Sequence, residues 1–195
     1  MVSLCLAAMV LLPLAEIVAR NLFGSGVRGS APLVQHLCLW VGFLGSALAA
    51  REDRLLSFAA CDLIPEGRWR SLSLGFATVV ATVVSGVLAR AGVEMVGYEK
   101  EAETFITGSL PVWVAQAVLP VAFVLIGLRM AWHTPGRWIG RSVSFLGLLA
   151  GCQLGAHYGL FDGNPAWPGL LVILAATLAG GPIFAALGGI AAVLF

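Results

Sequence analysis

PLVQHLCLWVGFLGSALAAREDRLLSF, residues Pro32–Phe58, decides the fold of this chain. Its first part, Pro32–Ala50, contains no Asp, Glu, Lys or Arg, and its length is close to the about 20 apolar residues that cross a bilayer. The charged cluster REDR, residues 51–54, ends this run. The following residues, to Leu63, place apolar side chains on one side of a helical wheel and polar ones on another. We therefore expect a transmembrane helix followed by an interfacial amphipathic helix.

The composition of the whole chain is that of an integral membrane protein. Of its 195 residues, 59% are hydrophobic and 11% are charged, and the mean hydropathy is +0.96. Soluble domains carry about 25% charged residues. The net charge of +1, without a basic stripe, gives no reason to expect nucleic acid as a partner. The apolar N-terminus lacks a basic leader and an Ala-x-Ala-like cleavage site, so we expect an uncleaved first helix.

Apolar runs along the chain predict about six transmembrane segments, and the fold class is therefore an all-α polytopic membrane protein. Pro120 is expected to kink the fourth segment. The sixth is expected to be broken at Gly180, Gly181 and Pro182, which frees backbone groups that neighbours or water must satisfy. The predicted segments are Ser3–Phe23, Pro32–Ala50, a long helix from Arg68 with its apolar part at Ser71–Ala89, Pro111–Trp132, Ser142–Leu160 and Leu170–Phe195.

Two pairs of opposite charges lie at one-turn spacing in the predicted helices. They are Glu16 with Arg20 in the first helix and Arg90 with Glu94 in the third. An unpaired carboxylate at membrane depth is strongly unfavourable, so we expect Glu16 to pair within its helix or reach the interface.

Small residues recur at four-residue spacing in two helices, which is the pattern of close helix packing in membranes. One ridge contains Gly42 and Ser46 in the second helix. The other is a longer stripe in the fifth helix, formed by Gly147, Gly151, Gly155 and Gly159. We expect both to be helix-packing faces.

The sequence predicts no catalytic, cofactor-binding or metal site, and we do not expect an enzyme. His36 and Cys38 stand two residues apart on a helix, so their side chains point about 200° from each other and cannot chelate one ion. No nucleophile with an adjacent base and no phosphate-binding loop is present. The competing class is a membrane-embedded redox protein such as a quinone-linked cytochrome subunit. His36 and His157 would be its axial haem ligands.

The distribution of Lys and Arg favours a cytoplasmic N-terminus. Seven of these residues then lie inside and four outside. The outer side would also carry the acidic loop Tyr98–Leu110, which is either a solvated loop or a docking surface. Five tryptophans stand at predicted span edges, as an aromatic belt requires, and Trp40 is the exception. The inner residues are Arg51, Arg54, Arg68, Arg70, Arg129, Arg137 and Arg141, and the outer ones are Arg20, Arg28, Arg90 and Lys100.

Three short motifs in the first sixty residues carry a resemblance to a transporter family. The first helix ends in RNLFG, residues 20–24, Pro32 opens the second, and GSALAARE, residues 45–52, closes it. In order and spacing this resembles the small (DctQ-like) membrane subunit of the tripartite ATP-independent periplasmic (TRAP) transporters. The last apolar segment, with its Gly180-Gly181-Pro182-Ile183 break, resembles the opening helix of the large (DctM-like) subunit.

The two resemblances together imply a fused membrane component. The domains are then a four-helix small-subunit-like part at residues 1–135, a linker with the fifth helix at 136–166, and the start of a large-subunit-like part at 167–195. The family implies uptake of small organic acids across the bacterial inner membrane, driven by an ion gradient, usually sodium. It implies three partners, namely the rest of the large permease subunit, a periplasmic binding protein and the lipid bilayer. We expect this piece to be a fragment of a longer polypeptide.

Overall fold

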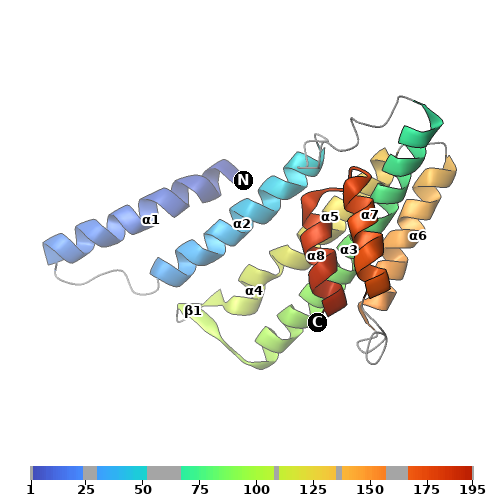
Figure 1. The fold of residues 1–195 in the computed structure, drawn as a ribbon. Helices are drawn as coiled ribbons and strands as arrows, with labels where there is room; N and C mark the ends of the chain where they lie inside the picture. Colours follow the sequence, from blue (N-terminus) through green and yellow to red (C-terminus); the bar gives the residue numbers. More distant parts are fainter. Residues whose placement is uncertain are drawn as a thin grey trace.

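The computed structural model describes residues 2–23, 30–51, 67–107, 110–134, 138–156 and 167–194. In these residues helices follow one another along the chain, with one short β-hairpin between the third and the fourth helix (Figure 1). The elements are α1 (Val2–Phe23), α2 (Ser30–Arg51), α3 (Arg68–Glu101), β1 (Phe105–Thr107), β2 (Leu110–Pro111), α4 (Val112–Gln116), α5 (Val118–His133), α6 (Trp138–Leu154), α7 (Trp167–Leu178) and α8 (Ile183–Leu194).

Four helical stretches in the described part of the chain are long and apolar enough to cross a membrane. They are Ser3–Leu22, Ser30–Ala50, Trp69–Glu101 and Val112–His133. The prediction of an all-α membrane protein is thus confirmed, but six spans are not found. The helix α6 has 17 residues, and α7 and α8 have 12 each, against the about 20 that a span requires. The expected interfacial helix after Arg51 lies outside the described residues.

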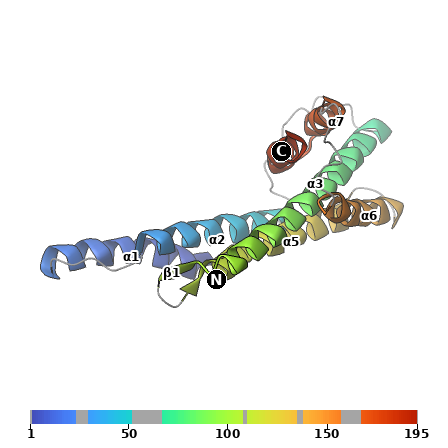
Figure 2. The ribbon, with the colours of Figure 1, turned by 90° about the horizontal axis from the view of Figure 1, so that it is seen from below.

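The long helix α3 is the centre of the fold. Its 34 residues measure about 50 Å at 1.5 Å per residue, which exceeds the roughly 30 Å hydrocarbon core. It contacts α4, α5, α6, α7 and α8. Seen from below, α3 lies between the α7–α8 pair on one side and α5 and α6 on the other (Figure 2). Every helix after α2 is therefore positioned by its packing on α3.

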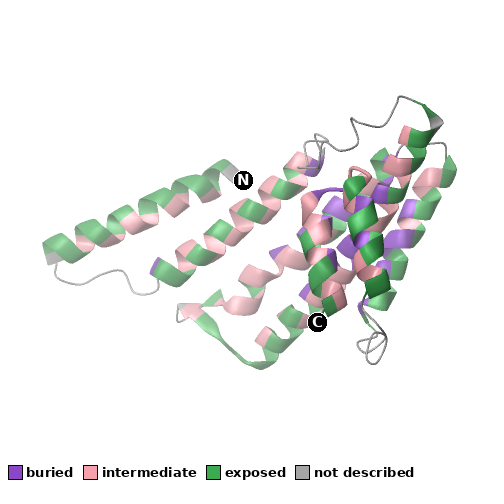
Figure 3. Ribbon diagram, viewed as in Figure 1, coloured by how far each residue is buried: buried purple, intermediate pink, exposed green. Residues whose placement is uncertain are grey.

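Small and polar residues form the buried core of this bundle. Figure 3 shows the buried residues gathered where α3, α5 and α6 meet. Thr82, Ser85 and Ser144 are its largest fully buried side chains. The hydroxyls of Thr82 and Ser85 donate to carbonyl oxygens of their own helix, each at 2.8 Å, so burial leaves no polar group unpaired there. Because these side chains are short, the helices can approach closely, as membrane helices commonly do.

The helices α1 and α2 form an arm beside this bundle. α1 packs on α2, and none of the apolar window in α1 is buried (Figure 1). Its exposed leucines and valines suit contact with lipid tails. α2 in turn contacts α4 and α5, where the rings of Phe43 and Phe123 meet edge to face at 5.3 Å. The bundle thus continues into the arm through α2.

The fourth predicted helix is interrupted at Ala117, between α4 and α5. Pro120 has no N–H to donate to the carbonyl of Gln116, four residues before it, and its ring disturbs the preceding turn. The interruption therefore falls just before the proline where a kink is expected. The indole Nε1–H of Trp40 donates to the carbonyl oxygen of Ala115 at 2.7 Å, beside this interruption. This bond explains why Trp40 stands away from a span edge.

The connection between α3 and α4 differs from the loop expected at Tyr98–Leu110. Helix α3 continues through Glu101, so Tyr98 and the charged residues next to it belong to its last turn. Beyond it, β1 and β2 pair antiparallel, with Phe105 opposite Pro111. At the end of the helix, Lys100 Nζ lies 5.9 Å from the ring centroid of Trp113 in α4. Glu99 and Glu101 are therefore held on the helix end, and Glu103 lies between the helix and β1.

Replacement of Trp40 by Phe should lower the stability of the bundle. The change keeps an aromatic ring but removes the hydrogen bond to Ala115, and such interhelical bonds are worth on the order of 1 kcal/mol. Thermal unfolding in nanodiscs, followed by circular dichroism at 222 nm, measures the effect. The matched control is Trp69→Phe, whose side chain is 79% exposed. Equal melting temperatures for the two variants would contradict a structural role for the Trp40 bond.

Candidate functional site

The backbones of α3 and α6 approach each other closely at two glycines. A Cβ atom added to Gly151 would lie 2.1 Å from the carbonyl oxygen of Val83, and one added to Gly86 would lie 2.3 Å from that of Leu148. Both distances are far below any real contact of a Cβ atom, and both opposing atoms belong to the backbone. Only glycine therefore fits at these two positions.

The neighbouring glycines of the predicted stripe on α6 face the same helix. A Cβ at Gly147 would be 3.1 Å from Thr82 Oγ1, and one at Gly155 would be 3.0 Å from Arg90 Cβ. Gly159 lies outside the described residues. Gly86, the partner of this stripe on α3, cannot be recognised from the sequence, because a lone glycine in a long apolar helix has no spacing signal of its own.

The second predicted ridge, on α2, is not a packing face within the described chain. Nothing lies within 4 Å of a Cβ placed on Gly42 or on Gly45. The hydroxyl of Ser46 donates to the carbonyl oxygen of Gly42 in its own helix, at 2.7 Å. Small-residue spacing makes close contact possible, but it does not specify that a partner helix is present.

The carboxylate of Glu16 connects α1 to the start of α2. It accepts a hydrogen bond from Arg20 Nη2 at 3.1 Å, one turn further along α1. Its other oxygen accepts a hydrogen bond from the hydroxyl of Ser30, the first residue of α2, which is buried. The charge at this depth is therefore compensated by two local donors, and the same contacts join the two helices of the arm.

The second charged pair lies in α3 at the edge of the α6 contact. Arg90 Nε is 3.0 Å from Glu94 Oε1, and both side chains are partly buried. The aliphatic stem of Arg90 covers Gly155, the residue directly after α6. This arginine therefore contributes packing through its stem and charge compensation through its guanidinium.

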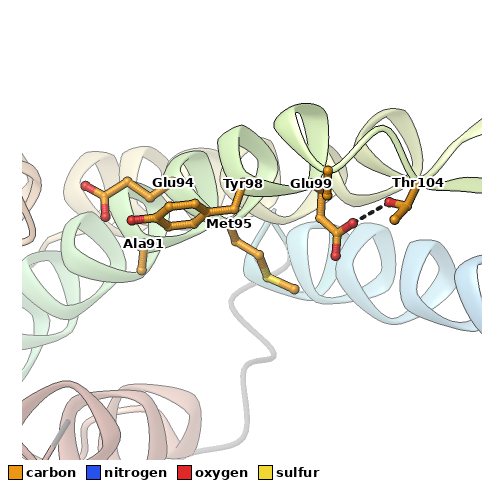
Figure 4. A pocket seen from close by; sticks show the side chains of 7 residues that line it. Ala91, Glu94, Met95, Tyr98, Glu99 and Thr104 are labelled. Atoms are coloured by element: carbon orange, nitrogen blue, oxygen red, sulfur yellow. Dashed lines mark hydrogen bonds between the residues drawn. The ribbon is translucent and has the colours of Figure 1, made fainter.

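Beyond this pair, the surface of α3 carries an open cavity of about 620 Å³. Figure 4 shows its side chains, with the ring of Tyr98 extending along the helix toward Glu94. The carboxylate of Glu99 accepts a hydrogen bond from the Thr104 hydroxyl at 2.6 Å, which ties the residue before β1 to the helix end. The lining begins 22 residues after Trp69, the first residue of the candidate span, and about 20 helical residues are enough to cross a hydrocarbon core. It is lined by Ala91, Glu94, Met95, Tyr98, Glu99, Ala102 and Thr104.

The chain reverses direction at Gly180, Gly181 and Pro182, between α7 and α8. Gly180 has φ +98°, in the left-handed region that favours glycine. Its N–H donates to Thr177 O at 3.1 Å, and the N–H of Gly181 donates to Ala176 O at 2.9 Å. These two bonds form a Schellman motif, which ends a helix and satisfies its last carbonyls.

The described residues contain no group of three or more His, Cys, Asp or Glu side chains that could hold a metal ion. The His36 Nδ1–H donates to the carbonyl oxygen of Pro32 at 2.8 Å, within its own helix. His157, the other ligand that a haem would need, lies outside the described residues.

Comparison with known families identifies residues 9–139 of the chain. The chain matches the family described as Tripartite ATP-independent periplasmic transporters, DctQ component, over residues 9–139. The match begins within α1, includes α2 to α5 and ends in the first turn of α6, so it covers more than half of the chain. The chain belongs to this family. No curated protein and no solved structure matches it.

The resemblance to the small TRAP subunit is thus confirmed. DctQ components are parts of transporters, not enzymes, and they work with a DctM component and a periplasmic binding protein. Family membership and the four apolar helices indicate a multi-pass protein of the inner membrane. The alternative of a quinone-linked cytochrome subunit is not favoured.

The Gly151→Ala substitution should destabilise the DctQ-family bundle, although it adds a single methyl group. That group collides with the Val83 carbonyl, so α3 and α6 must separate, and overpacking of this kind costs about 1–3 kcal/mol. Gly42→Ala is the matched control, because nothing lies within 4 Å of the new Cβ. Chemical or thermal unfolding in nanodiscs compares the two. A Gly151→Ala variant as stable as Gly42→Ala would show that the α3–α6 contact is not close.

Proposed function

We propose that this chain is the scaffold part of a secondary TRAP transporter that takes up small organic acids with a sodium gradient. The periplasmic binding protein delivers the substrate, and residues 167–195 begin the large, DctM-like part, with 136–166 as the linker. The observation that supports a scaffold role is the state of the charges in α1–α5. The ion pairs Glu16–Arg20 and Arg90–Glu94 are both compensated inside their own helices.

Ligand sites in secondary transporters are usually built from broken helices, whose ends and unwound carbonyls coordinate ions and anionic substrates. In the family-matched part, the interruption at Ala117 is joined to α2 through Trp40 and Ala115, which suits a structural bend. The chain reversal at Gly180–Pro182 lies outside the matched residues. We therefore assign ligand chemistry to the large-subunit-like part and anchoring to residues 1–135.

We also propose that the last turn of α3 and the β-hairpin face the periplasm and help to dock the binding protein. Acidic side chains and exposed aromatic ones occur together there, since Tyr98 is 72% and Phe105 59% exposed. The open cavity beside Glu94 and Glu99 makes this surface concave, so a side chain of a partner protein could enter it. Basic side chains of a partner protein would match its charge, and complementary charge chiefly accelerates association.

The orientation is tested by single-cysteine labelling in spheroplasts, in a chain whose four native cysteines are replaced by Ala. The Glu101→Cys variant should react with a membrane-impermeant maleimide, because the end of α3 faces outward in this proposal. The control is His133→Cys at the end of α5, which is also exposed and should react only after permeabilisation. The reverse pattern would invert the orientation and remove the docking surface from the periplasm.

The scaffold role is tested by transport kinetics of the assembled transporter in proteoliposomes with its binding protein. Glu16→Gln, His36→Ala and Arg90→Gln should leave the KM for substrate and the sodium dependence unchanged. Turnover or the yield of assembled transporter should fall for Glu16→Gln and Arg90→Gln, because each loses a local ion pair.

His36→Ala is the matched control, because it removes a polar side chain that forms no ion pair. Among the described contacts, His36 bonds only to a carbonyl oxygen of its own helix. A selective loss of sodium coupling in any of the three variants would place an ion site in α1–α5. That result would overturn the proposal that residues 1–135 anchor the transporter and that only the large-subunit-like part binds the ligands.

A further inference from the structure

We propose that residues 167–194 form a helical hairpin, which is seated along α3 and has both of its ends on the same side of the bilayer. The sequence predicts one broken transmembrane helix, whose two ends would lie on opposite sides of the bilayer. A hairpin instead places both ends on the same side. The described parts of the two arms, Trp167–Leu178 and Ile183–Leu194, are helices joined by a turn at Gly180, Gly181 and Pro182.

The turn between the arms is closed by specific hydrogen bonds. Gly180 and Gly181 end α7 with a Schellman motif, and Pro182 follows, where its missing N–H prevents continuation of α7. The hydroxyl of Ser73 in α3 donates to the carbonyl oxygen of Ala179 at 3.2 Å. A turn within a membrane must satisfy its backbone groups, and α3 supplies one of the partners.

The two arms pack against each other along their length. A Cβ at Gly189 in α8 would lie 3.0 Å from Ile173 Cδ1 in α7, near the middle. At the open end, a Cβ at Gly169 would lie 3.1 Å from both γ-carbons of Val193. Figures 1 and 2 show α7 and α8 side by side from two directions. The contacts at both positions require an antiparallel pair, because a straight helix would separate residues 169 and 193 by about 36 Å.

Contacts with α3 set the depth of the hairpin. Its turn meets α3 at Ser73, and further along, Gly189 faces Val84 and Gly188 faces Leu88. Ser73 and Leu88 are 15 residues apart, or about 22 Å along the helix axis. Ser73 itself is only about 6 Å along the axis from Trp69, at the start of the span. The hairpin thus carries its turn across most of the bilayer, toward the side where α3 begins.

A designed disulfide tests the hairpin directly. Gly169 and Val193 are replaced by Cys in a chain whose native cysteines are replaced by Ala. The Cβ atom built on Gly169 is 3.8 Å from Val193 Cβ, the mean separation of these atoms in disulfides. Mild oxidation in membranes should therefore protect both thiols from a maleimide–polyethylene glycol reagent. The control pair is Leu174→Cys with Val193→Cys. Leu174 is 56% exposed and stands five residues nearer the turn, so this pair should stay fully reactive.

The path through the membrane is tested with single cysteines at the exposed ends of the arms, Trp167→Cys and Leu194→Cys. A membrane-impermeant maleimide should label both variants from the same side. Absence of the Gly169–Val193 crosslink, or labelling of the two ends from opposite sides, would overturn the hairpin. Neither measurement depends on transport, so failure of the hairpin and failure of the scaffold role are distinguishable.

Discussion

Backbone contact between α3 and α6 is the constraint on which the other helix positions depend. Lipid tails are as apolar as the side chains, so burial of apolar surface gives membrane helices little reason to associate. Association depends on close packing, and close packing requires that no Cβ stands between the backbones. Gly86 and Gly151 meet that requirement from opposite helices. The hydroxyls of Thr82 and Ser85 bond within α3, so their burial beside this contact leaves no polar group unsatisfied.

The length of α3 links this packing to the expected function. Its first two thirds lie against α5, α6 and the α7–α8 pair, while its last turns, which carry Tyr98 and acidic residues, exceed the about 20 residues that a membrane crossing requires. The Arg90–Glu94 pair lies between these two regions, and the Arg90 stem covers Gly155. A partner that binds at the outer end would therefore act on the helix that also positions the membrane segments.

Much of this arrangement can be predicted from sequence, because helix length and small-residue spacing are local properties. The approximate positions of the first two helices, the start of the third and the stripe at Gly147–Gly155 follow from them. The partner of a stripe does not, and Gly42 shows why, since the same spacing faces no described atom. The reversal at Gly180 also escapes prediction. A Gly-Gly-Pro break permits a kink or a full turn, and contacts with Ser73, Val84 and Leu88 select the turn.

The family match ends at residue 139, but helices beyond that residue still pack on α3. The match stops at residue 139, in the first turn of α6, yet α6, α7 and α8 are packed on α3, a helix of the matched part. Glycines mediate these contacts on both faces, with Gly151 against Val83 and Gly188 against Leu88. Contacts of this kind have little freedom to slide, because a shift of one residue brings a side chain against a backbone. The described segment after the family match is therefore packed on the same helix, α3, as the matched helix α5.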